Sequence, residues 1–163
     1  MASYAGLPGT VYLTGAGPGS ARLLTVRAVE VLKSADVVFH DDLVTDEILS
    51  LIPPHVRLHN VGKRCGPKMI SQQEIQEKIV RAARSGQTVV RLKGGDPLVF
   101  GRAQEEIGAL REHGIPFEIV PGVTAACAAA AVAQISLTGR RPRLYRDVLG
   151  CSTCAGDTKG VVG

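Results

Sequence analysis

Short apolar stretches alternate with helix-like segments along most of this chain, and this alternation constrains the fold more than any other feature. Strands are expected over residues 11–14, 36–42, 56–61, 88–92 and 117–122. The connections between them are long enough to carry helices, as parallel strands require and hairpins do not. The pattern therefore predicts an α/β fold, in which right-handed βαβ units build a parallel β-sheet with helices on both faces.

Local signals mark where the helices begin and end. Ser71 and Glu74 have the spacing of a capping box, and Gly86 suits the left-handed position after a helix. Pro53 ends a shorter helix that begins after residue 45. Further helices are expected over residues 103–113 and over the alanine-rich residues 124–133.

Composition narrows the class of protein. The chain has 163 residues, 45% hydrophobic and 21% charged, which suits one globular domain with a substantial core. Aromatic residues make up 4% and tryptophan is absent, so we expect no base-stacking surface and no nucleic-acid partner. The net charge of +4 fits either a solvated basic surface or an anionic small-molecule substrate.

Targeting and metal signals are weak. The sequence shows no signal peptide and no apolar run of membrane-spanning length, so we expect no membrane partner. The four cysteines form no disulfide framework, which favours a reducing, cytoplasmic location. Cys151 and Cys154 form one isolated C-x-x-C pair and the histidines are scattered, so no metal site is expected.

Glycines and charged residues lie at or just after the end of each of the five expected strands. They are residues 15–19, Asp41, residues 62–63, residues 94–96 and residues 122–125. Ligands of open parallel sheets bind at the carboxyl ends of the strands. The five segments together therefore predict a ligand site at that edge.

The segment "GGDP", residues 94–97, is the most informative of these. Gly94 and Gly95 would let a ligand lie against the main chain, and Asp96 could accept hydrogen bonds from ribose hydroxyls or an amine. Asp96 could instead cap the following helix. Both roles remain open from the sequence.

The segment "GAGPGS", residues 15–20, departs from a dinucleotide-binding fingerprint. Ser20 stands where the third glycine should be, and Pro18 lacks the N–H that a phosphate cradle would use. The turn is either structural or suited to a neutral or cationic ligand. An ordinary nucleotide-binding domain is therefore the weakest alternative.

Two charged residues are candidates for acid–base chemistry. Asp41 ends a strand and could act as a general base, a helix cap or a solvated acid. Lys63 lies in a glycine-bounded basic loop and could be surface charge or contact substrate carboxylates.

In this order the motifs resemble the uroporphyrinogen-III C-methyltransferases, within the tetrapyrrole methylase family. The resemblance covers roughly residues 10–138 and rests on residues 11–44, on "VGKRCG", on "VVRLKGGDPLVFGRAQEE" and on "VPGVTAACAAAA". It implies S-adenosyl-L-methionine as methyl donor and a tetrapyrrole substrate, uroporphyrinogen III, methylated twice to precorrin-2 for siroheme and cobalamin synthesis. It also implies a homodimer in full-length relatives.

The resemblance assigns roles by motif position. Asp41 falls at the proton acceptor and Lys63 at the proton donor. The positions that it places at the cofactor are Pro18, Gly94, Gly95, Asp96, Val99, Thr124 and Ala125.

The resemblance stops near Thr138. The family continues into a second domain of similar size, whereas here Gly139 opens a stretch rich in Gly, Arg and Thr without helical or strand periodicity. We expect an N-terminal methylase domain over residues 10–138 and a divergent, disordered tail over residues 139–163. A changed reading frame or a truncated product would explain this and would impair the enzyme. The alternatives are an inactive ligand-binding fragment and another tetrapyrrole methyltransferase.

Overall fold

The computed structural model describes residues 9–62 and 70–138, and the expected tail over 139–163 and Lys63 lie outside them. Its elements are β1 (Val11–Gly15), η1 (Ala21–Leu23), α1 (Val26–Ser34), β2 (Val37–His40), α2 (Asp46–Leu49), β3 (Arg57–Asn60), α3 (Gln72–Arg84), β4 (Val89–Lys93), α4 (Ala103–Glu112), β5 (Phe117–Val120) and α5 (Ala125–Ala133).

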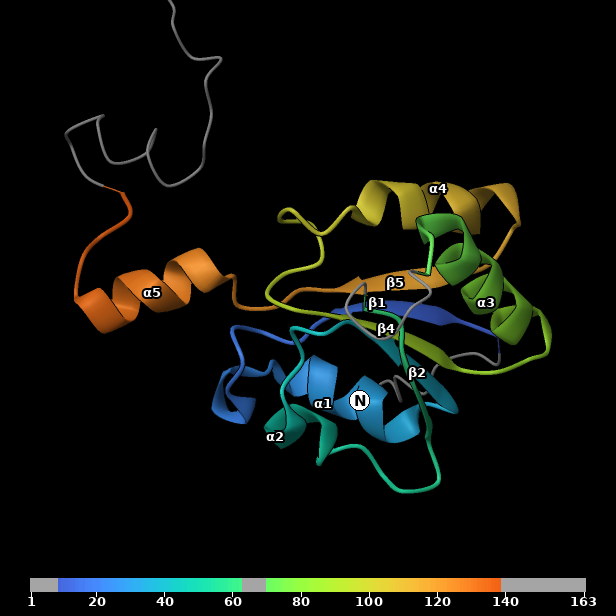
Figure 1. The fold of residues 1–163 in the computed structure, drawn as a ribbon, viewed down its shortest axis with the longest axis horizontal. Helices are drawn as coiled ribbons and strands as arrows, with labels where there is room; N and C mark the ends of the chain where they lie inside the picture. The colour runs from blue at the N-terminus through green and yellow to red at the C-terminus, as the bar shows by residue number, and fades with distance from the viewer. Residues whose placement is uncertain (1–8, 63–69, 139–163) are drawn as a thin grey trace, which may run out of the picture. The chain divides into compact units, whose positions relative to one another are not determined.

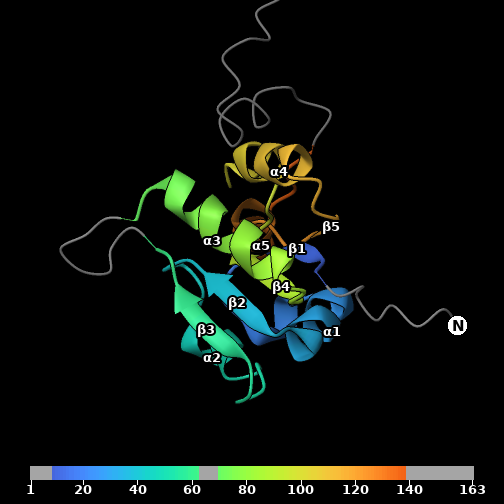
Figure 2. The same ribbon diagram turned by 90° about the vertical axis from the view of Figure 1, so that its right-hand side faces the viewer.

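The five strands form one parallel sheet in the order β3-β2-β4-β1-β5, which confirms the predicted α/β fold. All five residues of β1 and of β4 are buried, whereas all four residues of the edge strand β3 are exposed. Central parallel strands covered on both faces read as continuous apolar runs. Figure 2 shows β3 at the edge of the sheet beside β2.

Helices cover both faces of the sheet, as Figure 1 shows, with α1 and α2 on one side and α3 and α4 on the other. Two apolar cores result. On the first side, residues of α1 and α2 pack against alternate strand residues such as Val38, Val90 and Leu92. On the second side, residues of α3 and α4 pack against the strand residues that face the other way, such as Leu13 and Val89.

Most helix boundaries agree with the local signals. The Ser71 hydroxyl accepts the Glu74 N–H while the Glu74 carboxylate accepts the Ser71 N–H, so the predicted capping box is present. Gly86 has a φ of +81°, the left-handed conformation expected after α3. The short helix α2 is different: it ends at Leu49, with Ser50 as its C-cap, rather than running to Pro53.

The chain divides into two compact units, residues 1–125 and 126–163. The first unit holds the whole sheet and the helices α1 to α4. Most of α5 belongs to the second unit, and its sequence of small residues forms the helix that was expected there. Within residues 9–62 and 70–138, no helix is both long and apolar enough to cross a bilayer.

Candidate active site

A pocket lies at the carboxyl ends of the strands in the first unit. Its volume is about 660 Å³, within the range typical of small-molecule sites. Every predicted site residue that the structure describes lines it: Pro18, Asp41, Gly94, Gly95, Asp96, Val99, Thr124 and Ala125. The loops after β1, β2, β4 and β5 are thus brought to one place, as the topology of an open parallel sheet requires.

One end of the pocket is built from backbone. Gly17 and Gly95 exchange two hydrogen bonds, with the Gly17 N–H donating at 3.1 Å and the Gly95 N–H at 2.8 Å. A Cβ atom on Gly15 would lie 2.6 Å from the Gly95 carbonyl oxygen and 2.7 Å from the Gly122 Cα. These glycines therefore allow three loops to touch one another, a role that the sequence did not distinguish from close approach by a ligand.

Asp96 links two of these loops. Its Oδ1 accepts the Leu98 N–H at 2.8 Å, and its Oδ2 accepts the Gly122 N–H at 2.9 Å. The helix α4 instead has Arg102 as its N-cap, so the alternative in which Asp96 caps that helix is wrong. Because each carboxylate oxygen has two lone pairs, Asp96 keeps acceptor capacity for a ligand in the pocket.

Asp41 follows β2 on the other side of the pocket. Its Oδ1 accepts the Leu43 N–H at 3.1 Å, and its Oδ2 accepts the Gly94 N–H at 3.3 Å. The N-cap of the next helix is Thr45, so Asp41 does not cap it. These two N–H groups hold the carboxylate beside the loop after β4, where it is half-buried and able to accept a proton.

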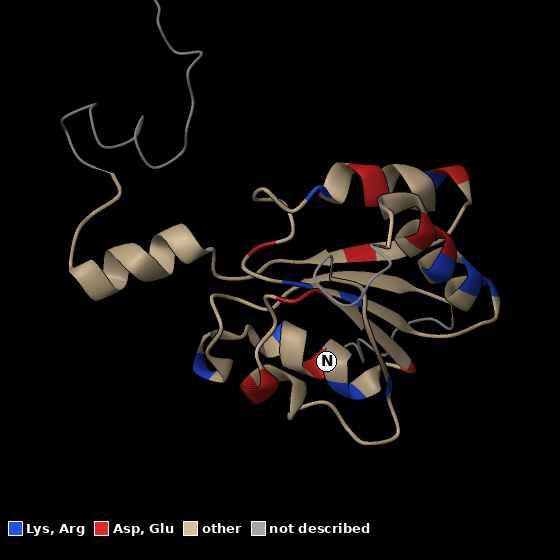
Figure 3. Cartoon of the chain, viewed as in Figure 1, with Lys and Arg blue, Asp and Glu red and all other residues tan. Residues whose placement is uncertain are grey.

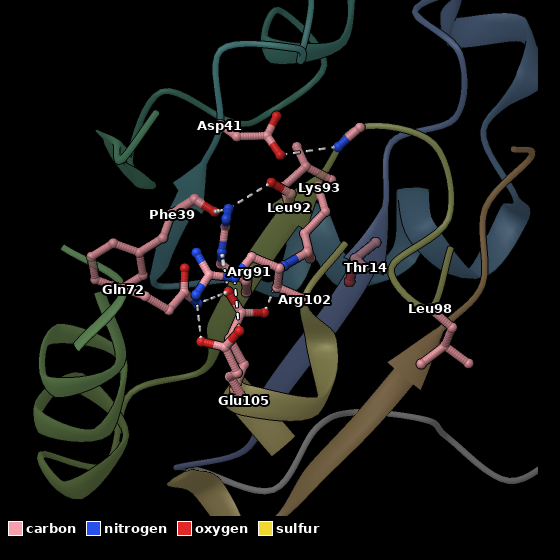
Figure 4. A network of polar contacts seen from close by, with 12 residues as sticks. Thr14, Phe39, Asp41, Gln72, Arg91, Leu92, Lys93, Leu98, Arg102 and Glu105 are labelled. Atoms are coloured by element: carbon pink, nitrogen blue, oxygen red, sulfur yellow. Dashed lines mark hydrogen bonds and ion pairs between the residues drawn. The ribbon is translucent and has the colours of Figure 1, made fainter. Parts of the chain in front are cut away.

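A cluster of buried charges lies at the same end of the pocket and was not predicted. Glu106 in α4 accepts Arg91 Nε at 3.0 Å and Lys93 Nζ at 2.8 Å, and Gln72 adds a third hydrogen bond at 3.2 Å. Figure 4 shows Gln72 of α3 beside Arg91 of β4, with Asp41, from the loop after β2, near the end of β4. Arg91, Lys93 and Gln72 also line the pocket.

Burial sets the proton affinity of Lys93. Desolvation lowers the pKa of its ammonium group, and the neighbouring positive charge of Arg91 acts in the same direction. The carboxylates of Glu106 and Asp41 oppose this shift. The side chain of Lys93 is 5% exposed, so its charge is poorly screened by water.

The sequence held a signal for this cluster. Arg91 and Lys93 alternate with apolar residues in a strand that the fold covers on both faces, and such cations need a buried carboxylate. Glu106 stands on the helix that follows. Choosing it over Glu105, which pairs with Arg102 at the surface, required the structure.

A second groove, of about 710 Å³, lies between α3 and α4 and is lined by residues such as Arg81, Arg84 and His113. Those two helices carry both acidic and basic residues on the outside of the molecule (Figure 3). The groove lies away from the strand ends and includes none of the predicted site residues. Within the described ranges, no group of three or more His, Cys, Asp or Glu side chains could hold a metal ion.

Residues 10–147 match the family of tetrapyrrole (corrin/porphyrin) methylases. The chain belongs to the tetrapyrrole methylase family. This confirms the family resemblance seen in the motifs.

Among curated members of the family, this tetrapyrrole methylase chain is similar to siroheme synthase 1 of Klebsiella pneumoniae, with 54% identity over 132 residues, 81% of this chain and 28% of that protein. It is 47% identical to uroporphyrinogen-III C-methyltransferase of Methanocaldococcus jannaschii over 135 residues, 83% of this chain and 56% of that protein. The chain thus spans about a quarter of the length of the first of these relatives and little more than half of the second.

Solved tetrapyrrole methylases share the fold. A Thermus thermophilus uroporphyrin-III C-methyltransferase, complexed with S-adenosylhomocysteine, superposes with a TM-score of 0.68 at 46% identity, covering 80% of this chain and 54% of that one. A cobalt precorrin-4 methyltransferase superposes with a TM-score of 0.72 at 35% identity, covering 80% and 53%. The fold is therefore shared across the family, while identity is higher toward the uroporphyrin-III enzyme.

Proposed function

We propose that this chain takes part in the S-adenosylmethionine-dependent C-methylation of uroporphyrinogen III to precorrin-2, on the route to siroheme and cobalamin. One observation carries the proposal: residues from four loops that the methyltransferase motifs assign to the site line a single pocket. The relatives at 46 to 54% identity bear the names of this enzyme or of siroheme synthase.

The pocket suits an adenosyl donor. Its glycine-loop end is lined by small residues, among them Gly17, Pro18, Gly95 and Ala125, and by the carboxylate of Asp96. We propose that Pro18, Gly94, Gly95, Asp96, Val99, Thr124 and Ala125 hold S-adenosylmethionine there. When bound, this cofactor supplies an electrophilic methyl group.

The remaining work of the chain is positioning and proton transfer. We assign Asp41, held by the N–H groups of Leu43 and Gly94, as the proton acceptor. Lys63 is assigned as the proton donor by its motif and lies outside the described residues. Lys63→Ala should accordingly lower kcat or raise KM for the tetrapyrrole.

We further propose a domain over residues 10–138, a cytoplasmic location and homodimerisation, the last of which the family resemblance implies for full-length relatives. The matched part of the chain covers 56% of the length of the Methanocaldococcus enzyme. We therefore assign the proposed activity to the domain that forms this pocket.

Transfer of labelled methyl from S-adenosylmethionine to uroporphyrinogen III, assayed with the purified chain, tests this function. We expect the parent chain to transfer the labelled methyl group and the Asp41→Asn variant to transfer none. Labelling of a later corrin precursor, but not of uroporphyrinogen III, would point to another tetrapyrrole methyltransferase. Binding of S-adenosylhomocysteine without any transfer would support a ligand-binding fragment instead.

A further inference from the structure

The buried charges at the end of the pocket are unequal in number. Arg91 and Lys93 lie in β4 with side chains that are 6% and 5% exposed. Both pair with one carboxylate, that of Glu106, whose side chain is 1% exposed. Excess charge in a poorly solvated place is costly unless a partner of opposite sign compensates for it. This end of the pocket is therefore suited to an anionic group of a ligand.

Both cations keep N–H donors, but Arg91 is held by three hydrogen bonds among the described residues and Lys93 by one. Arg91 Nε donates to Glu106, and Nη1 donates to the Phe39 carbonyl at 3.2 Å and to the Leu92 carbonyl at 3.0 Å. The Lys93 ammonium group has three N–H donors, and within residues 9–62 and 70–138 its one hydrogen bond goes to Glu106 Oε2 at 2.8 Å.

Other charges face Lys93 from each neighbouring element. Glu106 comes from α4 and Arg91 from β4 itself, while Asp41 acts on Lys93 from the end of β2. Asp41 interacts with Lys93 through space, since its own hydrogen bonds come from the N–H groups of Leu43 and Gly94. Arg102, which lines the pocket, pairs with Glu105 at the surface.

We propose that Lys93 binds a carboxylate of the tetrapyrrole substrate and that Glu106 is the positioning residue that holds the Lys93 ammonium group in place for it. The inference rests on the proposed function, because it takes the ligand to be a polycarboxylate tetrapyrrole. The substrate's acetate and propionate side chains would supply a carboxylate that accepts hydrogen bonds from Lys93, whereas Asp41 acts on Lys93 through space and accepts its own hydrogen bonds from Leu43 and Gly94.

The main test replaces Lys93 in the 163-residue chain. Lys93→Met removes the ammonium group, keeps most of the stem, and leaves Arg91 paired with Glu106. The probes are uroporphyrin III, the air-stable oxidised form with the same carboxylates, and S-adenosylhomocysteine. We expect uroporphyrin affinity to fall about 10- to 100-fold, as for a lost hydrogen bond to a charged group, with S-adenosylhomocysteine affinity unchanged. Lys78→Met, at an exposed position of α3, is the matched control and should change neither affinity.

A second test separates positioning from simple structural support. Glu106→Gln removes the charge that raises the pKa of Lys93, so the ammonium group should lose its proton at lower pH. Uroporphyrin affinity of this variant should approach that of the parent at pH 6 and fall away from it toward pH 9. Glu112→Gln, exposed on the same helix, should follow the parent at every pH.

The outcomes are distinguishable. Lys93→Met with parental uroporphyrin affinity, or a Glu106→Gln profile parallel to that of the parent, would overturn the proposed role of Lys93 and Glu106. Failure of the parent chain to bind S-adenosylhomocysteine would instead count against the proposed function. If Glu106→Gln does not fold, Lys93→Met alone decides, because its remaining Arg91–Glu106 pair is balanced in charge.

Discussion

The two ends of the pocket are built in different ways. At one end, Gly15, Gly95 and Gly122 bring three loops into backbone contact, and Asp96 ties two of these loops together. At the other end, the charged side chains of β4 and α4 form a buried cluster around Glu106. The first end depends on the absence of side chains, and the second depends on one carboxylate that pairs with two cations.

The largest expected effect comes from removing the carboxylate that Arg91 and Lys93 share. Glu106→Gln leaves two buried cations without their carboxylate, and we expect the free energy of unfolding to fall by about 3–5 kcal/mol. Chemical denaturation at pH 7 measures this. Glu112→Gln on the exposed face of α4 should stay within about 0.5 kcal/mol of the parent, and equal losses in the two variants would contradict the account.

Adding a side chain at the glycine end should reduce the free energy of unfolding for steric reasons. Gly15→Ala places a Cβ atom 2.6 Å from the Gly95 carbonyl oxygen, which should cost about 1–3 kcal/mol of stability. Gly108→Ala is the matched control, because a Cβ atom there meets nothing within 4 Å and alanine favours a helix interior. Denaturation should therefore show opposite signs for the two substitutions, and the same sign for both would refute the steric explanation.

Asp96 has two roles at the glycine end, since it holds two loops together and is proposed to bind the cofactor. Asp96→Ala should weaken S-adenosylhomocysteine binding by about 1–3 kcal/mol, because a charged acceptor is lost. It should also reduce stability, since the Leu98 and Gly122 N–H groups lose their acceptor. Calorimetric titration of the folded variant separates the two effects. Unchanged affinity would restrict Asp96 to holding the loops.

The smallest expected effect on stability comes from a surface ion pair, Arg27 with Glu118, which contrasts with the buried cluster. Arg27 hydrogen-bonds Glu118 through Nε at 2.9 Å and Nη2 at 2.7 Å, which lowers the pKa of Glu118 below its usual value of 4.5. The Glu118 side chain is 41% exposed, so water screens the pair.

The stability from this pair should be present above pH 4.5 and disappear as the pH falls through the lowered pKa of Glu118. Glu118→Gln should thus cost less than about 1 kcal/mol at pH 7. In denaturation at pH values further and further below 4.5, the difference between the variant and the parent should shrink. A loss as large as that of Glu106→Gln would contradict the distinction between surface and buried pairs.

The contrast between the two ends also explains what the sequence could predict. The strand alternation and the strand-end glycines are local signals, and they were enough for the sheet and its two helical layers. The predicted residues that line the pocket came from the strand-end segments together with the family resemblance, which alone assigned Val99. The strand order could not be read from the alternation, because pairing between distant strands depends on how the whole sheet packs.

The buried cluster was missed for a related reason. Gln72, Arg91 and Glu106 come from α3, β4 and α4, so their meeting depends on helix packing across the sheet rather than on spacing within a motif. Likewise, the glycines showed that something approaches the backbone, but only the structure identified other loops as the close neighbours of Gly15 and Gly122.

The central claim is that the pocket at the strand ends binds an adenosyl donor. Calorimetric titration of the 163-residue chain with S-adenosylhomocysteine, and separately with NAD, tests it most directly. The account predicts saturable binding of S-adenosylhomocysteine that Asp96→Ala weakens, and no binding of NAD. Binding of NAD in preference to S-adenosylhomocysteine, or no binding of S-adenosylhomocysteine to the folded chain, would contradict it.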